Sequence, residues 1–215
     1  VKVATSIFKD RYSIDLIYAR PEQTLKSWKD ELLKAIELSP YHLSLYQLTI
    51  EEGTYFYKKK LKTISDEDAE GLYNLTMEIT EKNNIPFYEV SNYARNGYEC
   101  KHNMNYWNSG EWIGIGAGAH GRVSFSKKRL AINNLRNPLD WIEKVEKKSI
   151  GFEEIEKLNE KEIFEEFLLM GLRKREGVDL KYFNRLIKGI DFFSFLDKNN
   201  LNMLNDKKLI EVFKN

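Results

Sequence analysis

The segment Cys100 to Trp107, with the sequence CKHNMNYW, brings together side chains that could bind a metal ion. It contains the chain's only thiol at Cys100, an imidazole at His102 and a thioether at Met104. These groups ligate soft and borderline transition metals. A turn is the simpler interpretation, with His102 and Asn103 bonded to backbone and two aromatic residues anchoring the segment in the core. The residues alone leave both interpretations open.

The ligands limit the kind of metal centre. A closed zinc site needs four Cys or His ligands, and an iron–sulfur cluster needs several thiolates, which one cysteine cannot supply. Seven aromatic residues lie between Phe87 and Trp112, and Arg95, Lys101 and Arg122 are close in sequence. A flat macrocycle such as haem requires apolar walls, an axial ligand and cations for its propionates. The segment therefore admits haem more readily than zinc.

Asp15 is a second candidate, because it is a carboxylate within the apolar segment SIDLIY. On a strand, Ser13, Asp15 and Ile17 share one face. A carboxylate in such a place must find hydrogen-bond donors. A ligand with hydroxyl groups, such as a ribose, would supply them. An ion pair or backbone amides of a loop would do the same without a ligand.

The segment GAGAHG, residues 116–121, matches the dinucleotide fingerprint GxGxxG letter for letter. No amphipathic helix follows it to receive a pyrophosphate, so we reject that interpretation. The glycines instead predict a close approach of the backbone to a neighbouring strand or a ligand. Nucleophile elbows and Walker-type loops do not occur in the sequence.

Alternating strands and helices must position these groups. Strands are expected at residues 12–21, 42–50 and 85–94, and helices at 22–38 and 66–84, with Ser65 as an N-cap. Residues 112–121 predict a buried strand. After residue 125 only helices are expected, at 138–148, 159–173, 180–187 and 192–198, with Asn159 as an N-cap.

This order predicts an α/β fold with a parallel sheet or barrel, followed by a small, mainly helical domain. The predicted domains are residues 1–125 and 126–215. In parallel α/β folds, binding sites lie at the carboxyl ends of the strands. His42 on its strand and His120 after the glycines are expected to be hydrogen-bonded structural groups.

Composition sets the class of protein. Lys and Arg total 34 against 33 Asp and Glu, a net charge of +1, so no nucleic-acid partner is indicated. No apolar run approaches the ~20 residues needed to span a bilayer. A single cysteine and no secretory segment predict a cytoplasmic protein.

Four stretches in one order resemble a known family: SIDLIYARPEQT, HLSLYQLTIEEGT, YEVSNYA followed by HNMNYW, and GIGAGAH. They are similar to the oxygen-independent coproporphyrinogen III oxidase-like radical SAM proteins. HNMNYW matches the HNxxYW motif of the HemW-like haem chaperones within that group. LLMGLRKREGVD resembles the start of the family's C-terminal domain. The resemblance covers the chain from about Tyr12 onward.

The resemblance implies the second half of a partial TIM-like radical SAM barrel over residues 1–125 and a helical C-terminal domain over 126–215. It implies S-adenosylmethionine and a [4Fe-4S] cluster in full-length members, with Asp15 contacting S-adenosylmethionine. It also implies haem bound by the motif His102, Asn103, Tyr106 and Trp107. We expect His102 to ligate the haem iron, with Cys100 or Met104 as alternatives.

The sequence also departs from the family pattern. Ala19 replaces a glycine, and PEQ replaces PGQ. The CxxxCxxC cluster motif and the glycine-rich SAM loop belong upstream of Val1, so the N-terminal barrel half is missing. We expect a fragment of a longer protein or a truncated gene product that is not catalytic alone.

The expected function is that of a haem chaperone, which binds haem for transfer to haem proteins of the respiratory chain. Peripheral membrane contact is compatible with that role. One alternative is an anaerobic coproporphyrinogen III dehydrogenase of porphyrin biosynthesis. The other is an inactive truncated remnant.

Overall fold

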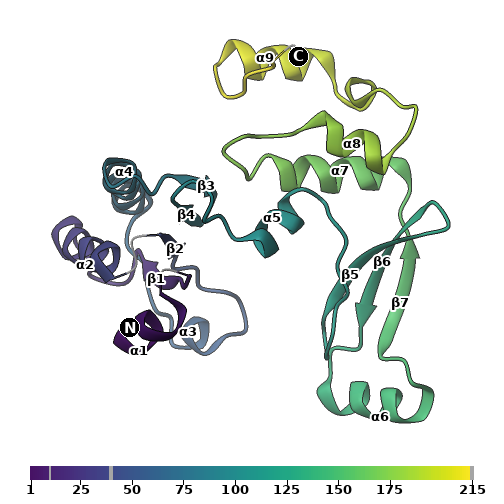
Figure 1. Ribbon diagram of the computed structural model, residues 1–215, viewed down its shortest axis with the longest axis horizontal. Coiled ribbons are helices and arrows are strands. Elements are labelled where there is room, and N and C mark those ends of the chain that lie inside the picture. The colour runs from purple at the N-terminus through teal and green to yellow at the C-terminus, as the bar shows by residue number, and fades with distance from the viewer. Residues whose placement is uncertain (10, 39–40, 214–215) are drawn as a thin grey trace. The chain divides into compact units, whose positions relative to one another are not determined.

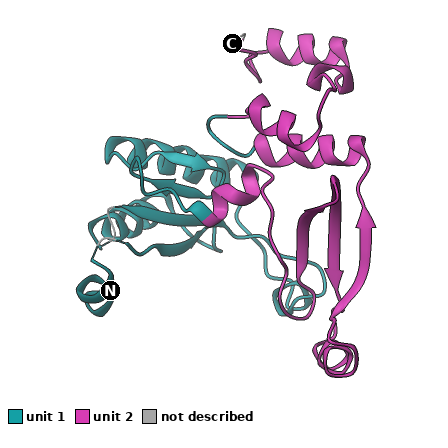
Figure 2. Cartoon of the chain, turned by 45° about the vertical axis from the view of Figure 1, so that its right-hand side comes forward, with its two compact units in different colours: residues 1–101, 173–176 teal, residues 102–172, 177–215 magenta. Residues whose placement is uncertain are grey.

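The expected strand–helix alternation is present in the computed structural model, which describes residues 1–9, 11–38 and 41–213. These residues form two units, one of residues 1–101 and 173–176 and one of residues 102–172 and 177–215 (Figure 2). The limits of the units differ from the predicted domains 1–125 and 126–215. That division into domains stays a prediction.

The first unit contains, in chain order, α1 (Lys2–Phe8), β1 (Ile14–Tyr18), α2 (Leu25–Leu38), β2 (His42–Gln47), α3 (Tyr55–Lys58), α4 (Asp66–Lys82), β3 (Phe87–Glu89) and β4 (Asn92–Ala94) (Figure 1). Its sheet has the strand order β1-β2-β4-β3, with β1 parallel to β2. β4 runs antiparallel to both of its neighbours.

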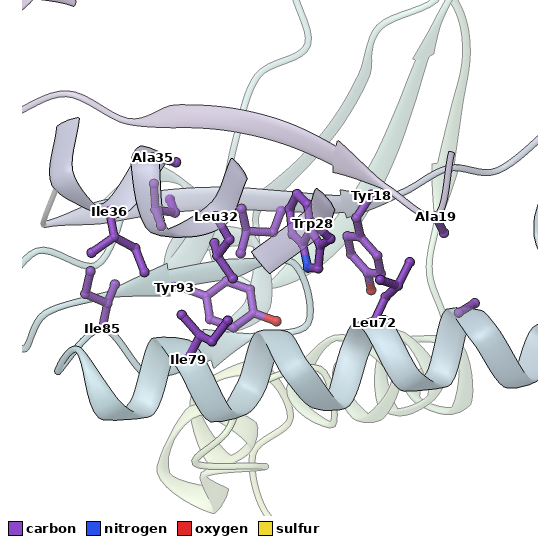
Figure 3. Packing of buried hydrophobic residues seen from close by; sticks show 13 residues of the cluster. Tyr18, Ala19, Trp28, Leu32, Ala35, Ile36, Leu72, Ile79, Ile85 and Tyr93 are labelled. Atoms are coloured by element: carbon purple, nitrogen blue, oxygen red, sulfur yellow. The ribbon is translucent and has the colours of Figure 1, made fainter. Parts of the chain in front are cut away.

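The core of this unit forms between α2, α4 and one face of the sheet. Trp28, Leu32 and Ile36 recur every four residues on α2, so they share one side of the helix. They pack with residues of α4 such as Leu72 and with Tyr93 of β4 (Figure 3). The buried Trp28 indole donates a hydrogen bond from Nε1 to Thr76 Oγ1 at 2.8 Å. The other face of the sheet keeps exposed side chains on β1.

The second unit begins with most of α5 (Lys101–Trp107) and then forms a sheet of β5 (His120–Phe125), β6 (Lys128–Asn134) and β7 (Phe152–Lys157), with α6 (Pro138–Lys148) between β6 and β7. The sheet is antiparallel throughout. It is followed by α7 (Glu160–Gly171), α8 (Leu180–Leu186), the 3-10 helix η1 (Phe192–Phe195) and α9 (Lys198–Asp206). Phe164 and Phe183 lie at the centre of a second core made by α7, α8 and η1.

Both predicted N-caps are confirmed. The Ser65 side chain accepts from the Asp68 backbone N–H at the start of α4. Asn159 and Glu162 form a complete capping box at the start of α7, each side chain bonded to the other's backbone N–H. Local sequence therefore determines where these helices begin.

Three predictions of local structure are wrong. Residues 112–119 do not form a buried strand: β5 begins at His120, and Ile113 and Ile115 are 77% and 85% exposed. The predicted strand 85–94 is instead the hairpin β3–β4, which turns at Val90 and Ser91. The segment CKHNMNYW is not a turn, because residues 101–107 form α5.

The predicted absence of strands after residue 125 is also wrong. β5 and β6 are joined by Ser126 and Lys127, both with positive φ (47° and 63°), the geometry of a tight hairpin turn. Such turns favour Asn-Gly, which is missing here, so the sequence carries no hairpin signal. β7 is charged and mostly exposed, as edge strands often are.

The Trp28–Thr76 hydrogen bond predicts a specific loss of stability. In Thr76→Val, the buried indole N–H loses its acceptor, so we expect the free energy of unfolding to fall by about 1–3 kcal/mol. Urea denaturation measures this change. Thr80→Val is the matched control, because Thr80 is equally buried in α4 but bonds only to carbonyls of its own helix. An equal loss in both variants would contradict the prediction.

Candidate functional site

α5 places the motif residues by helical spacing. His102 and Tyr106 are four residues apart and therefore lie on the same side of the helix. The Tyr106 hydroxyl and His102 Nε2 are 3.1 Å apart, and their rings meet edge to face. Asn103 and Trp107, also four apart, are partly buried. The helix thus presents an exposed imidazole whose ring is oriented by a phenol.

The alternative ligands do not share this side of α5. Met104 is two residues from His102, which is about 200° around the helix axis, so the two side chains point in nearly opposite directions. Cys100 precedes the helix, and its backbone N–H donates to the Tyr88 hydroxyl at 3.3 Å. Of the three candidate ligands, only His102 is exposed, whereas Cys100 and Met104 are partly buried.

A chain of contacts supports Tyr106 from behind. Its ring meets Trp112 edge to face with the centroids 4.7 Å apart. The Arg122 guanidinium lies 5.9 Å from the centre of the Trp112 ring and donates to both carboxylate oxygens of Glu166 at 2.6–3.1 Å. Each of these contacts restricts the rotation of the two side chains that it joins. The orientation of the His102 ring therefore depends on four other side chains.

Arg129 stabilises the end of the same helix. This β6 residue is 6% exposed, and its Nη2 donates to the carbonyl oxygens of Ser109 and Gly110 at 2.9 and 2.8 Å. Burial lowers the pKa of the Arg129 guanidinium, while the charges of Glu166 and Glu111 oppose that change. Ser109 and Gly110 follow α5, and their amides close its last turn by donating to the carbonyls of Tyr106 and Asn105, so this buried cation holds the segment that ends the helix.

The glycines after α5 allow close contact with β5, as the sequence predicted. The backbone amides of Trp112 and Arg122 each donate to the other's carbonyl at 2.8 and 2.9 Å. A Cβ on Gly114 would lie 2.4 Å from the His120 carbonyl oxygen, so only glycine fits there. Asn134 Nδ2 donates to the carbonyls of Gly114 and Gly116. The segment is therefore a backbone layer packed on β5, not a phosphate-binding loop.

Asp15 lies on the face of the sheet that the helices leave uncovered, together with Ser13 and Ser44. The Asp15 carboxylate is exposed, although it lies within an apolar segment. Ser13 Oγ donates to it at 3.4 Å. An exposed carboxylate on this face can accept hydrogen bonds from the hydroxyls of a ligand.

His42 connects this face to the segment before α5. Its Nδ1 is 2.8 Å from Ser13 Oγ, and its Nε2 is 2.9 Å from the Tyr88 hydroxyl, which accepts from the Cys100 amide. The expectation that His42 is a hydrogen-bonded structural group is confirmed. Burial lowers the pKa of His42 below 6.5, and the carboxylates of Asp15 and Glu99 oppose that change. The imidazole is therefore neutral near pH 7. The side chain of His120, in contrast, is exposed at the first residue of β5.

Two of the three cations that were expected near the haem propionates already contact other side chains of the protein. Arg122 is paired with Glu166, and Arg95 lies 5.2 Å from the centre of the Tyr41 ring. Nothing in the sequence indicated that Trp112, Arg129 or Glu166 would support α5. Only the four-residue spacing of His102 from Tyr106 could have predicted the helix.

Comparisons with known proteins agree with this architecture. A family model described as the HemN C-terminal domain matches residues 158–213. The chain is 36% identical over 236 residues to the mitochondrial radical S-adenosyl methionine domain-containing protein 1 of Dictyostelium discoideum, covering 96% of this chain and 53% of the relative. It is 33% identical over 184 residues to the heme chaperone HemW of Bacillus subtilis, covering 84% of this chain and 48% of the relative.

A solved structure, coproporphyrinogen III oxidase (HemN) of Escherichia coli, described as a radical SAM enzyme, has the same fold. It superposes with a TM-score of 0.69 at 16% identity, covering 93% of this chain and 48% of that one. The α/β class, as part of a radical SAM barrel with helices after it, is thereby confirmed. The chain belongs to the coproporphyrinogen III oxidase-like radical SAM family that includes the HemW proteins. It spans about half the length of the curated relatives it matches.

The residues of this chain do not fit a four-iron cluster and haem equally well. A single cysteine, Cys100, does not fit a four-iron cluster. In the described part of the chain, no group of three or more His, Cys, Asp or Glu side chains could hold a metal ion. An exposed imidazole such as His102 does fit haem, because haem iron requires only one or two axial protein ligands. Among residues 1–9, 11–38 and 41–213, no helix is long and apolar enough to cross a membrane.

The lowered pKa of His42 predicts how stability depends on pH. Above pH 6.5, His42 is neutral in both folded and unfolded chains and contributes no difference. As pH falls below 6.5, the unfolded chain binds a proton that the folded chain does not, so the free energy of unfolding decreases. Urea denaturation of the wild type and His42→Gln from pH 7.5 to 5 measures this. We expect the wild type to lose more stability than the variant, and parallel curves would contradict it.

Arg129 predicts a local effect on α5. In Arg129→Met, the carbonyls of Ser109 and Gly110 lose their donor, so the amides of residues 108–110 that close the last turn should exchange with solvent faster. A loss of about 1–3 kcal/mol corresponds to roughly 5- to 150-fold faster exchange. Hydrogen exchange measured by NMR tests this. Arg136→Met, at an exposed arginine of the same unit, should leave these rates unchanged.

Proposed function

We propose that this chain forms the haem-binding part of a haem chaperone, which passes haem to haem proteins of the respiratory chain. The observation that carries the proposal is the exposed His102 imidazole, oriented by Tyr106 on a helix that Trp112 and Arg129 support. The similarity to proteins named heme chaperone HemW supports the same function.

Each motif residue has a role in this proposal. His102 ligates the haem iron, and Tyr106 orients its ring, as hydrogen-bonded partners of metal-binding histidines do. If Tyr106 stays bonded to Nε2, the iron is bound through Nδ1. Asn103 and Trp107, the other two motif residues, would lie against the apolar ring of haem. Cys100 and Met104 remain the alternative ligands, although neither shares the side of α5 that carries His102.

A separate role for Asp15 is proposed for full-length members of the family. Its exposed carboxylate would accept hydrogen bonds from ribose hydroxyls of S-adenosylmethionine. A [4Fe-4S] cluster would be held by cysteines outside this chain, so any coproporphyrinogen III dehydrogenase activity would also require the longer protein.

Haem titration of His102→Ala tests the proposal. We expect the wild-type chain to bind haem saturably, with a shifted Soret band, and His102→Ala to lose that band. Tyr106→Phe keeps the ligand but loses its orienting hydroxyl, so its affinity should fall by about tenfold. His120→Ala is the matched control, because it removes an exposed histidine of the same unit outside α5.

Other outcomes identify the alternatives. Binding that survives His102→Ala but is lost in Cys100→Ser or Met104→Leu would move the ligand to that residue. No saturable haem binding to the wild type would reject the proposed function of this chain. Circular dichroism of each variant separates loss of the ligand from loss of the fold.

A further inference from the structure

The strand β7 leaves one edge of its sheet unpaired. The strand order is β5-β6-β7, so β6 pairs with one side of β7, and in the described part of the chain no strand pairs with the other side (Figure 1). The side chains of residues 153–157 are all exposed. An unpaired edge offers a row of backbone donors and acceptors, to which an extended segment of another chain can add a strand.

The hydrogen bonds to β6 show which backbone groups of β7 face outward. The Leu158 amide donates to the Arg129 carbonyl at 3.0 Å, so the backbone groups of Leu158 face β6. Groups that face the partner strand alternate with groups that face away along an antiparallel strand. The amides and carbonyls of Lys157 and Ile155 therefore point away from β6. Glu153, which has no partner in the register with β6, lies at a bulge just before this stretch.

The side chains of β7 differ between the two faces of the sheet. Glu154 and Glu156 share one face. Ile155 and Lys157 share the other face, on which the Ile155 side chain is 47% exposed beside the partly buried Ile132 of β6. An added strand would place alternate side chains against the two carboxylates and against Ile155. The edge therefore fits a segment in which basic and apolar residues alternate.

The same carboxylates disfavour a second copy of this chain as the added strand. If two β7 strands paired in antiparallel fashion about Ile155, Glu154 of each copy would lie opposite Glu156 of the other. Like charges directly opposite each other destabilise a pair of strands. Basic side chains in place of the second copy's carboxylates would turn this repulsion into attraction, so charge selects a different partner.

We propose that β7 binds an extended basic segment of a partner protein as a fourth strand of its sheet. Basic side chains of that segment lie beside Glu154 and Glu156, and an apolar side chain lies beside Ile155. Backbone hydrogen bonds to Ile155 and Lys157 supply affinity, and the two faces supply specificity. The site involves no residue of α5 and requires no haem. Because the charges are exposed, affinity should fall as salt concentration rises.

Fluorescence anisotropy of a labelled synthetic peptide, KVKVKVK, tests this edge on the full chain. We expect saturable binding to the wild type, which Ile155→Pro weakens by about tenfold through the loss of one backbone hydrogen bond. Proline removes only the outward amide and leaves the hydrogen bonds between β6 and β7 in place. Ile155→Val is the matched control, since it keeps the amide and a branched side chain, and it should bind as the wild type does.

Further measurements test charge and pattern. The double variant Glu154→Gln with Glu156→Gln should bind the peptide about fivefold more weakly and with less dependence on salt. The peptide KKKKVVV, which has the same composition without the alternation, should not bind saturably. His102→Ala should bind KVKVKVK as the wild type does, so this proposal and the haem proposal can fail separately.

Four results would overturn the proposal. The first is equal affinity of the wild type and Ile155→Pro, with the strand content of both unchanged by circular dichroism. The second is equal binding of KKKKVVV, which would show attraction to charge alone. The third is a dimer in sedimentation velocity that Ile155→Pro dissociates, which would assign the edge to a second copy. The fourth is no saturable binding to the wild type. If Ile155→Pro loses strand content, the glutamine variant and KKKKVVV decide the test.

Discussion

A helix of seven residues is too short to be stable on its own, and this constraint governs the candidate haem site. Helices α2 and α4 gain their stability from broad apolar faces, whereas α5 has no fully buried residue. Contacts at its carboxyl end must therefore compensate: Arg129 bonds to the two carbonyls that follow it, and Tyr106 packs on Trp112. The position of His102 thus depends on Trp112 and on Arg129 of β6, which lie outside the helix.

Two arginines of the second unit also contribute to the support of α5. Two arginines lie on adjacent strands, but only Arg122 forms an ion pair, with Glu166 on α7. Arg129 is more deeply buried: its Nη2 donates to two carbonyl oxygens, its Nη1 has no hydrogen-bond partner among the described residues, and the charges of Glu166 and Glu111 favour the charged guanidinium. Replacing either arginine by lysine would keep the charge and lose the planar geometry that reaches two acceptors at once. The planar shape of the two guanidinium groups therefore supports α5 as well as their charge does.

The sequence predicted those elements whose signals are local. The side chains of Ser65 and Asn159 each accept a hydrogen bond from the backbone amide three residues further along the chain, which marks the start of a helix. Helix α2 is evident from its repeated apolar spacing. Features that depend on tertiary contacts were missed. The Ser126–Lys127 turn has no glycine to reveal the β5–β6 hairpin, and the exposure of Asp15 was not predicted, because the sequence of one strand does not show which of its faces is covered.

The same distinction explains how well the candidate site could be predicted. The residue types in CKHNMNYW left a metal site and a turn open, and haem was expected there from the family resemblance. The four-residue spacing of His102 and Tyr106 is that of a helix, which was not expected. The role of Trp112, Arg122 and Glu166 in supporting α5 could not be inferred, because these residues meet only after three separate elements have packed together. The residue types of a candidate motif are visible in the sequence, whereas the orientation of its side chains is a property of the fold around them.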